Sequence, residues 1–284
     1  MNHLLNADLH CHSVFSDGTL TPHDLARRAK DNEVDLWALT DHDEIGGLDQ
    51  ALDAARSVGL PFLTGVEISV TFAGATVHIV GLGFDHRHPA LVEGLRSTRS
   101  GREQRAREMA AELERVGIRG AFEGAMKYVD NPELVSRTHF ARYLVEAGYC
   151  QDTHEVFRQY LADGKPGYVP HRWASLGDAV RWIRDAGGVA VIAHPARYPL
   201  SANGEYALFS EFKAHGGTGV EVVTSAHTAE EVARYAETCR EFGLLASRGS
   251  DFHSPQESRL DLGRLPDLPG NVTPIWTVLE SRLQ

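Results

Sequence analysis

The sequence predicts an α/β fold in which a barrel-like domain carries an inserted group of helices. Two observations predict this fold. Strand-like and helix-like segments alternate up to about residue 98 and again from about residue 171, as in parallel sheets and barrels. Between these stretches, residues 99–170 show helical patterns only. We therefore expect a discontinuous barrel domain, residues 1–98 and 171–284, and a helical insertion, residues 99–170, that covers the mouth of the barrel.

The first part of the barrel is expected to run strand, helix, strand, helix, strand, strand. Thr21 is a suitable N-cap for the first helix, with Pro22 at the first helical position and Asp24 in the first turn. The second helix is Gly47–Val58. The four expected strands are Leu4–Leu9, Leu36–Thr40, Phe62–Val70 and Thr76–Leu82.

The same hydrophobic patterns predict the helices of the insertion and the elements of the second part of the barrel. In the insertion, apolar residues recur at helical offsets at Ala106, Met109, Ala110, Leu113 and Val116. Further helices are expected at Thr138–Ala147 and Thr153–Ala162. The alternation then resumes with helices Leu176–Ala186, Tyr206–His215 and Ala229–Phe242 and strands Val189–Ala193, Gly219–Val223 and Leu244–Ser247.

Composition excludes several classes of protein. No apolar run approaches the roughly 20 residues that span a bilayer, so no membrane association is expected. Met1–Asn6 is too short and polar for a signal peptide, and three cysteines are too few for a disulfide framework, so we expect a cytoplasmic protein. The net charge of −11 argues against binding to duplex DNA, although bound divalent cations would still attract a small anion. No obligate protein partner is evident.

Histidines and carboxylates gather at the ends of six expected strands. His10 and His12 end the first strand and, being two residues apart, point to the same side. The other candidates are Asp17, His42, Glu67, His78, His194, Asp251 and His253. Because the carboxyl ends of barrel strands converge on one mouth, these side chains are expected to meet in space. Cys11 points the other way and is expected in the core.

Each of these signals alone has a plain structural explanation. An HxH pair on a strand, a His-Pro turn such as His194-Pro195 and an Asp-His helix cap such as Asp41-His42 all occur without a metal. Their coincidence at six strand ends favours a metal cluster. Nitrogen and oxygen ligands without cysteine suit manganese, iron or zinc.

In order and content, these motifs resemble those of the polymerase and histidinol phosphatase (PHP) family of metal-dependent phosphoesterases. The motifs are Asp8-Leu9-His10-Cys11-His12 with Ser16-Asp17-Gly18, Thr40-Asp41-His42-Asp43, Gly65-Val66-Glu67, Ala193-His194-Pro195 and Gly249-Ser250-Asp251-Phe252-His253. The resemblance implies a distorted (β/α)7, TIM-like barrel. It also implies two or three divalent metal ions per chain, with Mn2+ favoured and Fe2+ or Zn2+ as alternatives.

The resemblance further implies a ligand set for each ion. The first ion would lie on His10, His12, Glu67 and Asp251, the second on Glu67, His78 and His194, and the third on Asp17, His42 and His253. Some family members have a histidine at the position of Asp17, which leaves the identity and occupancy of the third ion open. Asp8, Asp41 and Asp43 are expected to orient the imidazoles.

The insertion resembles one PHP branch in Val135–Arg142 and Gly164–Pro170, together with the barrel segment His194–Tyr198. Members of that branch remove the 3′-phosphate from 3′,5′-nucleoside bisphosphates such as pAp, and some trim short RNAs from the 5′ end, an activity called RNase AM. A substrate with two phosphates needs cations and hydrogen-bond donors for the phosphate that is not cleaved. The candidates are Ser136, Arg137, His139, Lys165 and Arg197.

The expected activity is therefore the hydrolysis of a phosphoric monoester, with Glu67, His194 and His253 as candidate catalytic residues. Three alternatives stay open: a histidinol-phosphate phosphatase, an amidohydrolase acting on C–N bonds, and a non-catalytic, metal-stabilised module. A run of arginines precedes the insertion helices at Arg96, Arg99, Arg102 and Arg105. We expect it to be a solvated helix face that pairs with Glu103, Glu108 and Glu112, rather than a track for RNA.

Overall fold

The computed structural model describes residues 5–284, so Leu4 and most of the segment Met1–Asn6 lie outside the described residues. Seven strands form one sheet in chain order. The strands are β1 (Ala7–Asp8), β2 (Leu36–Leu39), β3 (Phe62–Phe72), β4 (Ala75–Leu82), β5 (Val189–Ile192), β6 (Gly219–Thr224) and β7 (Leu245–Gly249). The backbone N–H of Leu9 donates to the carbonyl oxygen of Arg248 at 3.0 Å, which links the two edges of the sheet into a nearly closed barrel. The predicted α/β barrel class is confirmed.

The sheet is mixed and not parallel throughout. β4 runs antiparallel to both β3 and β5, whereas the other neighbours pair in parallel. The expectation of parallel strands is therefore wrong for β4, which follows β3 after the tight turn Ala73-Gly74. Glu67 lies inside β3 and not at its end. His78 pairs with Ser69 of β3, so it reaches the same end of the barrel as Glu67 although β4 runs in the opposite direction.

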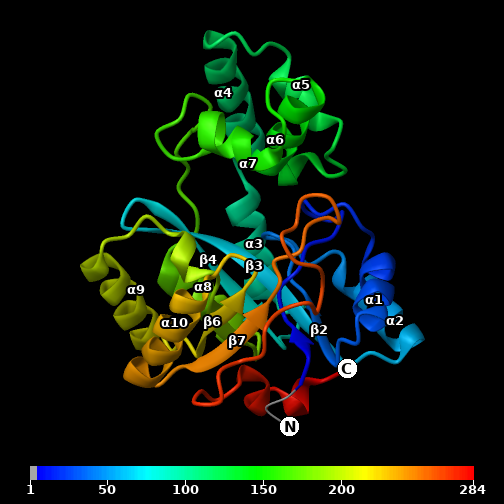
Figure 1. The fold of residues 1–284 in the computed structure, drawn as a ribbon, viewed down its shortest axis with the longest axis vertical. Helices are drawn as coiled ribbons and strands as arrows, with labels where there is room; N and C mark the ends of the chain where they lie inside the picture. The colour runs from blue at the N-terminus through cyan, green and yellow to red at the C-terminus, as the bar shows by residue number, and fades with distance from the viewer. Residues whose placement is uncertain (1–4) are drawn as a thin grey trace.

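Helices cover the barrel, as Figure 1 shows. Around the barrel lie α1 (Pro22–Asp31), α2 (Leu48–Val58), α3 (Pro89–Arg99), α8 (Leu176–Asp185), α9 (Ala202–Ala214) and α10 (Ala229–Phe242). α1 packs on α2 at one flank, and α9 on α10 at the other (Figure 1). Short 3-10 helices occur at Pro132–Leu134, Pro195–Arg197, Ile275–Val278 and Glu280–Arg282. Within residues 5–284, we find no helix with the length and apolar character that a membrane span requires.

Polar caps define the starts of several barrel helices. The Thr21 hydroxyl accepts a hydrogen bond from the backbone N–H of Asp24 at 3.1 Å, which confirms the predicted start of α1. α9 begins earlier than predicted, because Ser201 caps it by accepting from the N–H of Gly204. Such caps satisfy backbone donors that the first helical turn leaves unpaired.

The insertion consists of α4 (Arg102–Arg115), α5 (Ala121–Met126), α6 (Arg137–Glu146) and α7 (Thr153–Val156), which continues as a π-helical turn through Leu161. Its buried side chains, among them Met109, Leu113 and Phe140, form a hydrophobic cluster separate from that of the barrel. Val116 is an exception to the predicted pattern, because it caps α4 and is exposed. In Figure 1, α4–α7 stand together at the end of the barrel away from the C-terminus. The domain limits at residues 98 and 170 remain a prediction.

Candidate metal centre

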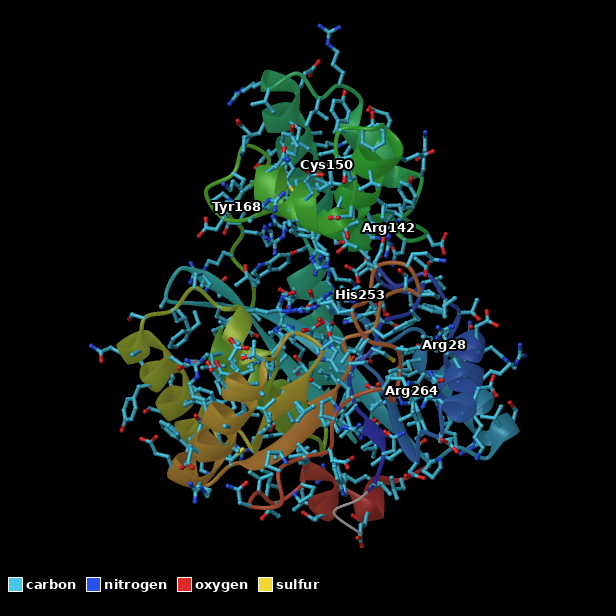
Figure 2. The ribbon with its side chains drawn as sticks, in the orientation of Figure 1. Arg28, Arg142, Cys150, Tyr168, His253 and Arg264 are labelled. Carbon is cyan, nitrogen blue, oxygen red and sulfur yellow. The ribbon has the colours of Figure 1, made fainter. Side chains whose placement is uncertain are left out.

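The predicted ligands meet at the end of the barrel that faces the insertion. Figure 2 shows His253 at this end, below Arg142 of the insertion. Eight of the nine residues fall into three groups whose ligand atoms lie within 4.8 Å of one another. The groups are His10, His12, Glu67 and Asp251; His12, Asp17, His42 and His253; and His42, Glu67 and His78. The ninth residue, His194, has its Nε2 atom 2.9 Å from Glu67 Oε1.

The first group brings four possible ligand atoms close together. Nε2 of His10 lies 3.2 Å from Nε2 of His12 and 3.2 Å from Glu67 Oε2. Nε2 of His12 lies 3.3 Å from the same oxygen and 3.2 Å from Asp251 Oδ1, and Nε2 of His10 lies 3.5 Å from Asp251 Oδ1. Nitrogen and oxygen atoms at such spacings could share one ion with bonds of about 2 Å.

Glu67 lies at the centre of the cluster and is fully buried. Its Oε1 atom lies 2.8 Å from Nδ1 of His78 and 2.9 Å from Nε2 of His194. Its Oε2 atom lies 2.9 Å from Nδ1 of His42 and close to Nε2 of His10 and His12, which follow β1. A carboxylate whose two oxygens face different sets of imidazoles has the geometry of a ligand shared between two cations.

Two histidines each belong to two groups. Besides its place in the first group, His12 has its Nδ1 atom 4.0 Å from Asp17 Oδ1. His42 has Nε2 3.9 Å from the same oxygen, while its Nδ1 faces Glu67. His253 belongs to one group only, with Nε2 3.3 Å from Asp17 Oδ1. The structure thus places His12 beside the residues expected for the third ion, and His42 beside those expected for the second.

Several buried polar atoms of the cluster have no hydrogen-bond partner among the described residues. They include His12 Nδ1, Asp17 Oδ1, Glu67 Oε2 and His194 Nδ1. Buried polar atoms in proteins are nearly always paired, and each unpaired one costs free energy. Cations would satisfy these atoms, so the residues present fit a cluster of divalent metal ions.

Hydrogen bonds fix which nitrogen of two imidazoles faces the cluster. His10 Nδ1 lies 2.7 Å from Glu221 Oε1, and His253 Nδ1 lies 3.0 Å from the carbonyl oxygen of Asp251. Both partners accept only, so Nδ1 is the donor in each ring. In the unprotonated ring, this leaves Nε2 of His10 and of His253 with the lone pair that metal ligation requires.

The aspartates expected to orient imidazoles anchor the ligand-bearing loops instead. Asp8 accepts the backbone N–H of Ser250 at 2.9 Å, and Asp41 accepts the N–H of Ser13 at 2.7 Å. Asp43 bonds to β3 and to α4. In the part of the chain that the structure describes, none of the three bonds to an imidazole ring. They act on the backbone that carries the ligands.

The electrostatics of the cluster favour charged carboxylates but act differently on its imidazoles. Burial alone would lower the pKa of His10, but nearby carboxylates, led by Glu221, outweigh it and raise that pKa well above its usual range. Burial would likewise lower the pKa of His12, but Asp251 and Glu67 raise it to about 10. Burial alone would raise the pKa of Glu67, but neighbouring imidazoles, led by His78, outweigh it and hold that pKa well below its usual range. Burial would likewise raise the pKa of Asp251, but Arg197 is foremost among the groups that hold it well below. Burial and then Arg197 lower the pKa of His194 to about 4. Negative oxygens and unprotonated nitrogens are the forms that bind cations.

The cluster forms one wall of a cavity of about 710 Å³ between the barrel and the insertion. On the barrel side, the lining includes Asp17, His42, Glu67, His78, His194, Arg197, Tyr198, Asp251 and His253. On the insertion side, it includes Arg102, Arg105, Ser136, Arg137, Phe157 and Tyr168. Acidic and imidazole groups thus face arginines across a single space.

Comparisons with known proteins agree with this geometry. A family model described as PHP domain matches residues 8–91. The chain is 52% identical to a 3′,5′-nucleoside bisphosphate phosphatase of Chromobacterium violaceum, over 99% of this chain and 98% of that protein. It is 43% identical to a 5′-3′ exoribonuclease of Haemophilus influenzae, over 95% and 97% of the two chains. The chain belongs to the PHP family.

A solved structure from Chromobacterium violaceum resembles this PHP fold closely. It is 53% identical, superposes with a TM-score of 0.95, and covers 98% of this chain and 97% of its own. That protein is described as an amidohydrolase and was solved with bound sulfate and without metal. The PHP barrel and its insertion therefore occur together in a relative over nearly the whole chain.

The five residues predicted to bind substrate lie at different depths in this PHP protein. Ser136, Arg137 and Arg197 line the cavity. His139 is buried, and its Nδ1 atom accepts the backbone N–H of Ser136 at 3.0 Å in the capping box that begins α6. Lys165 is exposed and is not part of the cavity lining. His139 thus supports Ser136 from behind the cavity wall.

The arginine run is only partly a solvated face. Arg96 is exposed and pairs with Glu93 at 2.8 Å, whereas two of the expected partners, Glu103 and Glu112, pair with Arg107 and Arg115. Arg102 and Arg105 are only 5% and 8% exposed and line the cavity, so the expectation is wrong for these two. The reason is a break at Gly101, where α3 has ended and α4 begins, so that the two pairs of arginines lie on different helices.

Glu221 of β6 is a residue of the site that the sequence analysis missed. It is buried, bonds His10 Nδ1, and accepts the backbone N–H of His194 at 2.7 Å. The available signal was an acid within the apolar run Gly219–Val223, because a carboxylate inside a buried strand needs a partner. Glu221 orients one candidate ligand and the backbone of another.

Proposed function

We propose that this PHP protein is a metal-dependent phosphoric monoester hydrolase that removes the 3′-phosphate from 3′,5′-nucleoside bisphosphates such as pAp. The products are a 5′-nucleotide and phosphate. The observation that carries the proposal is the single cavity with the cluster around Glu67 on one wall and Ser136 and Arg137 on the other. A substrate with two phosphates needs the metal cluster for the phosphate that reacts and the opposite wall for the phosphate that does not. The 52% identical relative carries the name of this activity.

We propose that residues 99–170 act as the unit that closes the cavity. Helices of the insertion supply Arg102, Arg105 and Arg137 to the lining, whereas the candidate metal ligands come from the barrel alone. The insertion then contributes substrate recognition, and the barrel contributes hydrolysis.

We propose the same ligand set for each ion that the family resemblance implied. His10, His12, Glu67 and Asp251 would hold one ion, Glu67, His78 and His194 a second, and Asp17, His42 and His253 a third. Manganese is the proposed ion, with iron or zinc compatible with the same nitrogen and oxygen donors. When bound, such ions lower the pKa of water and neutralise charge on the phosphoryl oxygens.

The chain's own residues would position the reaction. Glu67 holds the two halves of the cluster together through its two oxygens. His253 presents Nε2, and His194 is held neutral by burial and by Arg197, so either ring could take up a proton from the attacking water and pass it to the leaving 3′-oxygen. Arg197 also pairs with Asp251, next to the reacting phosphate.

Ser136 and Arg137 would bind the non-reacting 5′-phosphate. Ser136 has its hydroxyl 3.1 Å from Asp17 Oδ2 and so stands at the border between the two walls. Arg137 lies one residue further into α6, at the start of a helix, where the backbone also favours an anion. Lys165 would have to reach the substrate from outside the present lining.

A second proposed activity is the trimming of short oligoribonucleotides from the 5′ end. Relatives from Haemophilus influenzae and Escherichia coli, 43% and 40% identical, are named 5′-3′ exoribonucleases. The chemistry is related, because removing the first nucleotide of a 5′-phosphorylated chain also cleaves phosphorus from oxygen on the 3′ side while a 5′-phosphate is held. The same cavity would serve both substrates.

A substrate panel tests the proposal. Purified protein loaded with manganese is assayed for phosphate release from pAp, 3′-AMP and 5′-AMP, and for 5′-AMP release from a 5′-phosphorylated RNA trimer. We expect hydrolysis of pAp with a kcat/KM at least about 100-fold above that of 3′-AMP, because one charge-assisted phosphate contact contributes about that factor. Cleavage of 3′-AMP as efficient as that of pAp would contradict recognition of the 5′-phosphate.

A further inference from the structure

Arg105 is a buried arginine without a carboxylate partner among the described residues. Its Nε donates to the carbonyl oxygen of Val169 at 2.9 Å, and its guanidinium lies 5.3 Å from the ring centroid of Trp173. No hydrogen bond within residues 5–284 engages its two terminal nitrogens, although the side chain is only 8% exposed and lines the cavity. A buried guanidinium with unused donors is costly unless an anion satisfies it.

Other arginines of the insertion show the usual solution. Arg102 forms an ion pair with Asp43, and Arg142 binds both oxygens of Glu257 at 2.8 and 2.7 Å. Both are as deeply buried as Arg105. The lack of a carboxylate at Arg105 is therefore a property of that position and not of the insertion as a whole.

Arg137 is a second guanidinium in this wall without a carboxylate partner. Its hydrogen bond within the described chain is a long one, from Nη1 to the carbonyl oxygen of Leu161 at 3.4 Å. Burial, followed by the charges of Arg137 and Arg102, lowers the pKa of Arg105 to about 9. Two cations in the same wall of the cavity thus repel one another.

We infer that Arg105 and Arg137 together bind the phosphate that is not hydrolysed, and that Arg105 determines the preference for substrates with two phosphates. This inference rests on the proposed function. Arginine suits the role because its planar fork can bind two phosphate oxygens at once. Trp173 supports the guanidinium of Arg105, and the Val169 carbonyl fixes its Nε, so the terminal nitrogens are pre-oriented toward the cavity.

Arg105→Met tests this inference, with Arg115→Met as the control. Arg115 lies on the same helix, and its side chain is 73% exposed. We expect Arg105→Met to lower kcat/KM for pAp about 100-fold, mainly through KM, and to leave kcat/KM for 3′-AMP within about 2-fold of the wild type. Arg115→Met should leave both unchanged. An equal loss on both substrates would overturn the inference, because it would assign Arg105 a general structural role.

Product binding gives an independent readout. Calorimetry of 5′-AMP and adenosine with the metal-loaded protein should show that Arg105→Met loses about 100-fold affinity for 5′-AMP only.

The two readouts separate this inference from the proposed function. If wild-type protein fails to hydrolyse pAp but binds 5′-AMP in a manner that depends on Arg105, the proposed function fails and the phosphate site stands. If pAp is hydrolysed but Arg105→Met behaves as the wild type in both kinetics and binding, the proposed function stands and the phosphate site fails.

Discussion

Glycines within β3 and at the end of β7 let the ligand-bearing backbones approach one another. A Cβ atom on Gly249 would lie 2.3 Å from Cβ of His10, and one on Gly65 would lie 2.4 Å from the carbonyl oxygen of Leu39. Neither neighbour is the flexible end of a side chain, so the backbone itself would have to move. The packing of single residues therefore sets the distances within the cluster.

Gly249→Ala should destabilise the barrel and displace His10. We expect the free energy of unfolding to fall by about 2–4 kcal/mol, because an added methyl group would overlap packed backbone. Gly270→Ala is the matched control, since a Cβ there would meet nothing within 4 Å. Denaturant unfolding of the three proteins measures the effect, and equal stability of the two variants would contradict the packing argument.

His139 makes the free energy of unfolding of the protein depend on pH in the acidic range. Burial is the main cause that lowers its pKa to about 4, from about 6.5 in an unfolded chain. The unfolded chain therefore takes up a proton between these values and the folded one does not. The stability contributed by the neutral ring is complete above about pH 6.5 and is lost as the pH falls through 4.

His139→Gln should remove this dependence while keeping the helix cap, because glutamine can accept the same backbone N–H in a capping box. Between pH 6.5 and 4, we expect the wild type to lose about 3 kcal/mol more free energy of unfolding than the variant. Urea unfolding at a series of pH values measures the difference. Parallel curves for the two proteins would show that His139 does not titrate as described.

Single residues were predictable where the backbone dictates their direction. His10 and His12 could be assigned to one side of a strand because side chains alternate along it. Arg102 and Arg105 could not be assigned to the cavity, because a spacing of three residues defines a helix face without saying whether that face is buried. Glu221 was missed because its partners, among them His10, are distant in sequence.

At the scale of elements, polar side chains join the insertion to the barrel. Arg142 of α6 binds Glu257, in the segment after β7, and donates to the backbone carbonyl of Asp17 at 2.7 Å. Arg102 of α4 binds Asp43 in the segment after β2. Because the two hydrophobic clusters are separate, these contacts fix the position of the insertion above the metal cluster.

Arg142→Met should weaken the attachment of the insertion to the barrel while both hydrophobic clusters stay folded. We expect KM for pAp to rise about 10-fold with little change in metal content, and amide exchange in residues 253–258 to become faster. Arg181→Met, which removes an exposed ion pair with Asp178 on α8, is the control and should change neither. Unchanged KM and unchanged exchange in Arg142→Met would contradict a positioning role for this contact.

The antiparallel direction of β4 could have been predicted from the short connection that precedes it. The expected strands Phe62–Val70 and Thr76–Leu82 were separated by too few residues for a parallel crossover, which needs a dozen or more. In the structure, Ala73 and Gly74 both have positive φ, 48° and 83°, as a tight hairpin turn requires. The short connection was therefore a readable signal for an antiparallel pair.

At the scale of the whole molecule, the site lies where two independent cores meet. The barrel brings residues from β3 and β4 and from the segments after β1, β2, β5 and β7 to one end, and the insertion faces them across the cavity. The order of strands follows the order of the chain, so motifs far apart in sequence become neighbours in space. This is why the barrel class and the convergence of its strand ends could be predicted, whereas the wall formed by α4 could not.

The central claim is that Glu67 joins the cluster into one centre that holds divalent metal ions for hydrolysis. Elemental analysis and phosphate release from pAp, measured on the same preparations of wild type, Glu67→Gln and the surface control Glu230→Gln, test it most directly. The account predicts that Glu67→Gln loses at least one equivalent of metal and at least about 100-fold in turnover, while the control matches the wild type. Unchanged metal content and unchanged turnover in Glu67→Gln would contradict it.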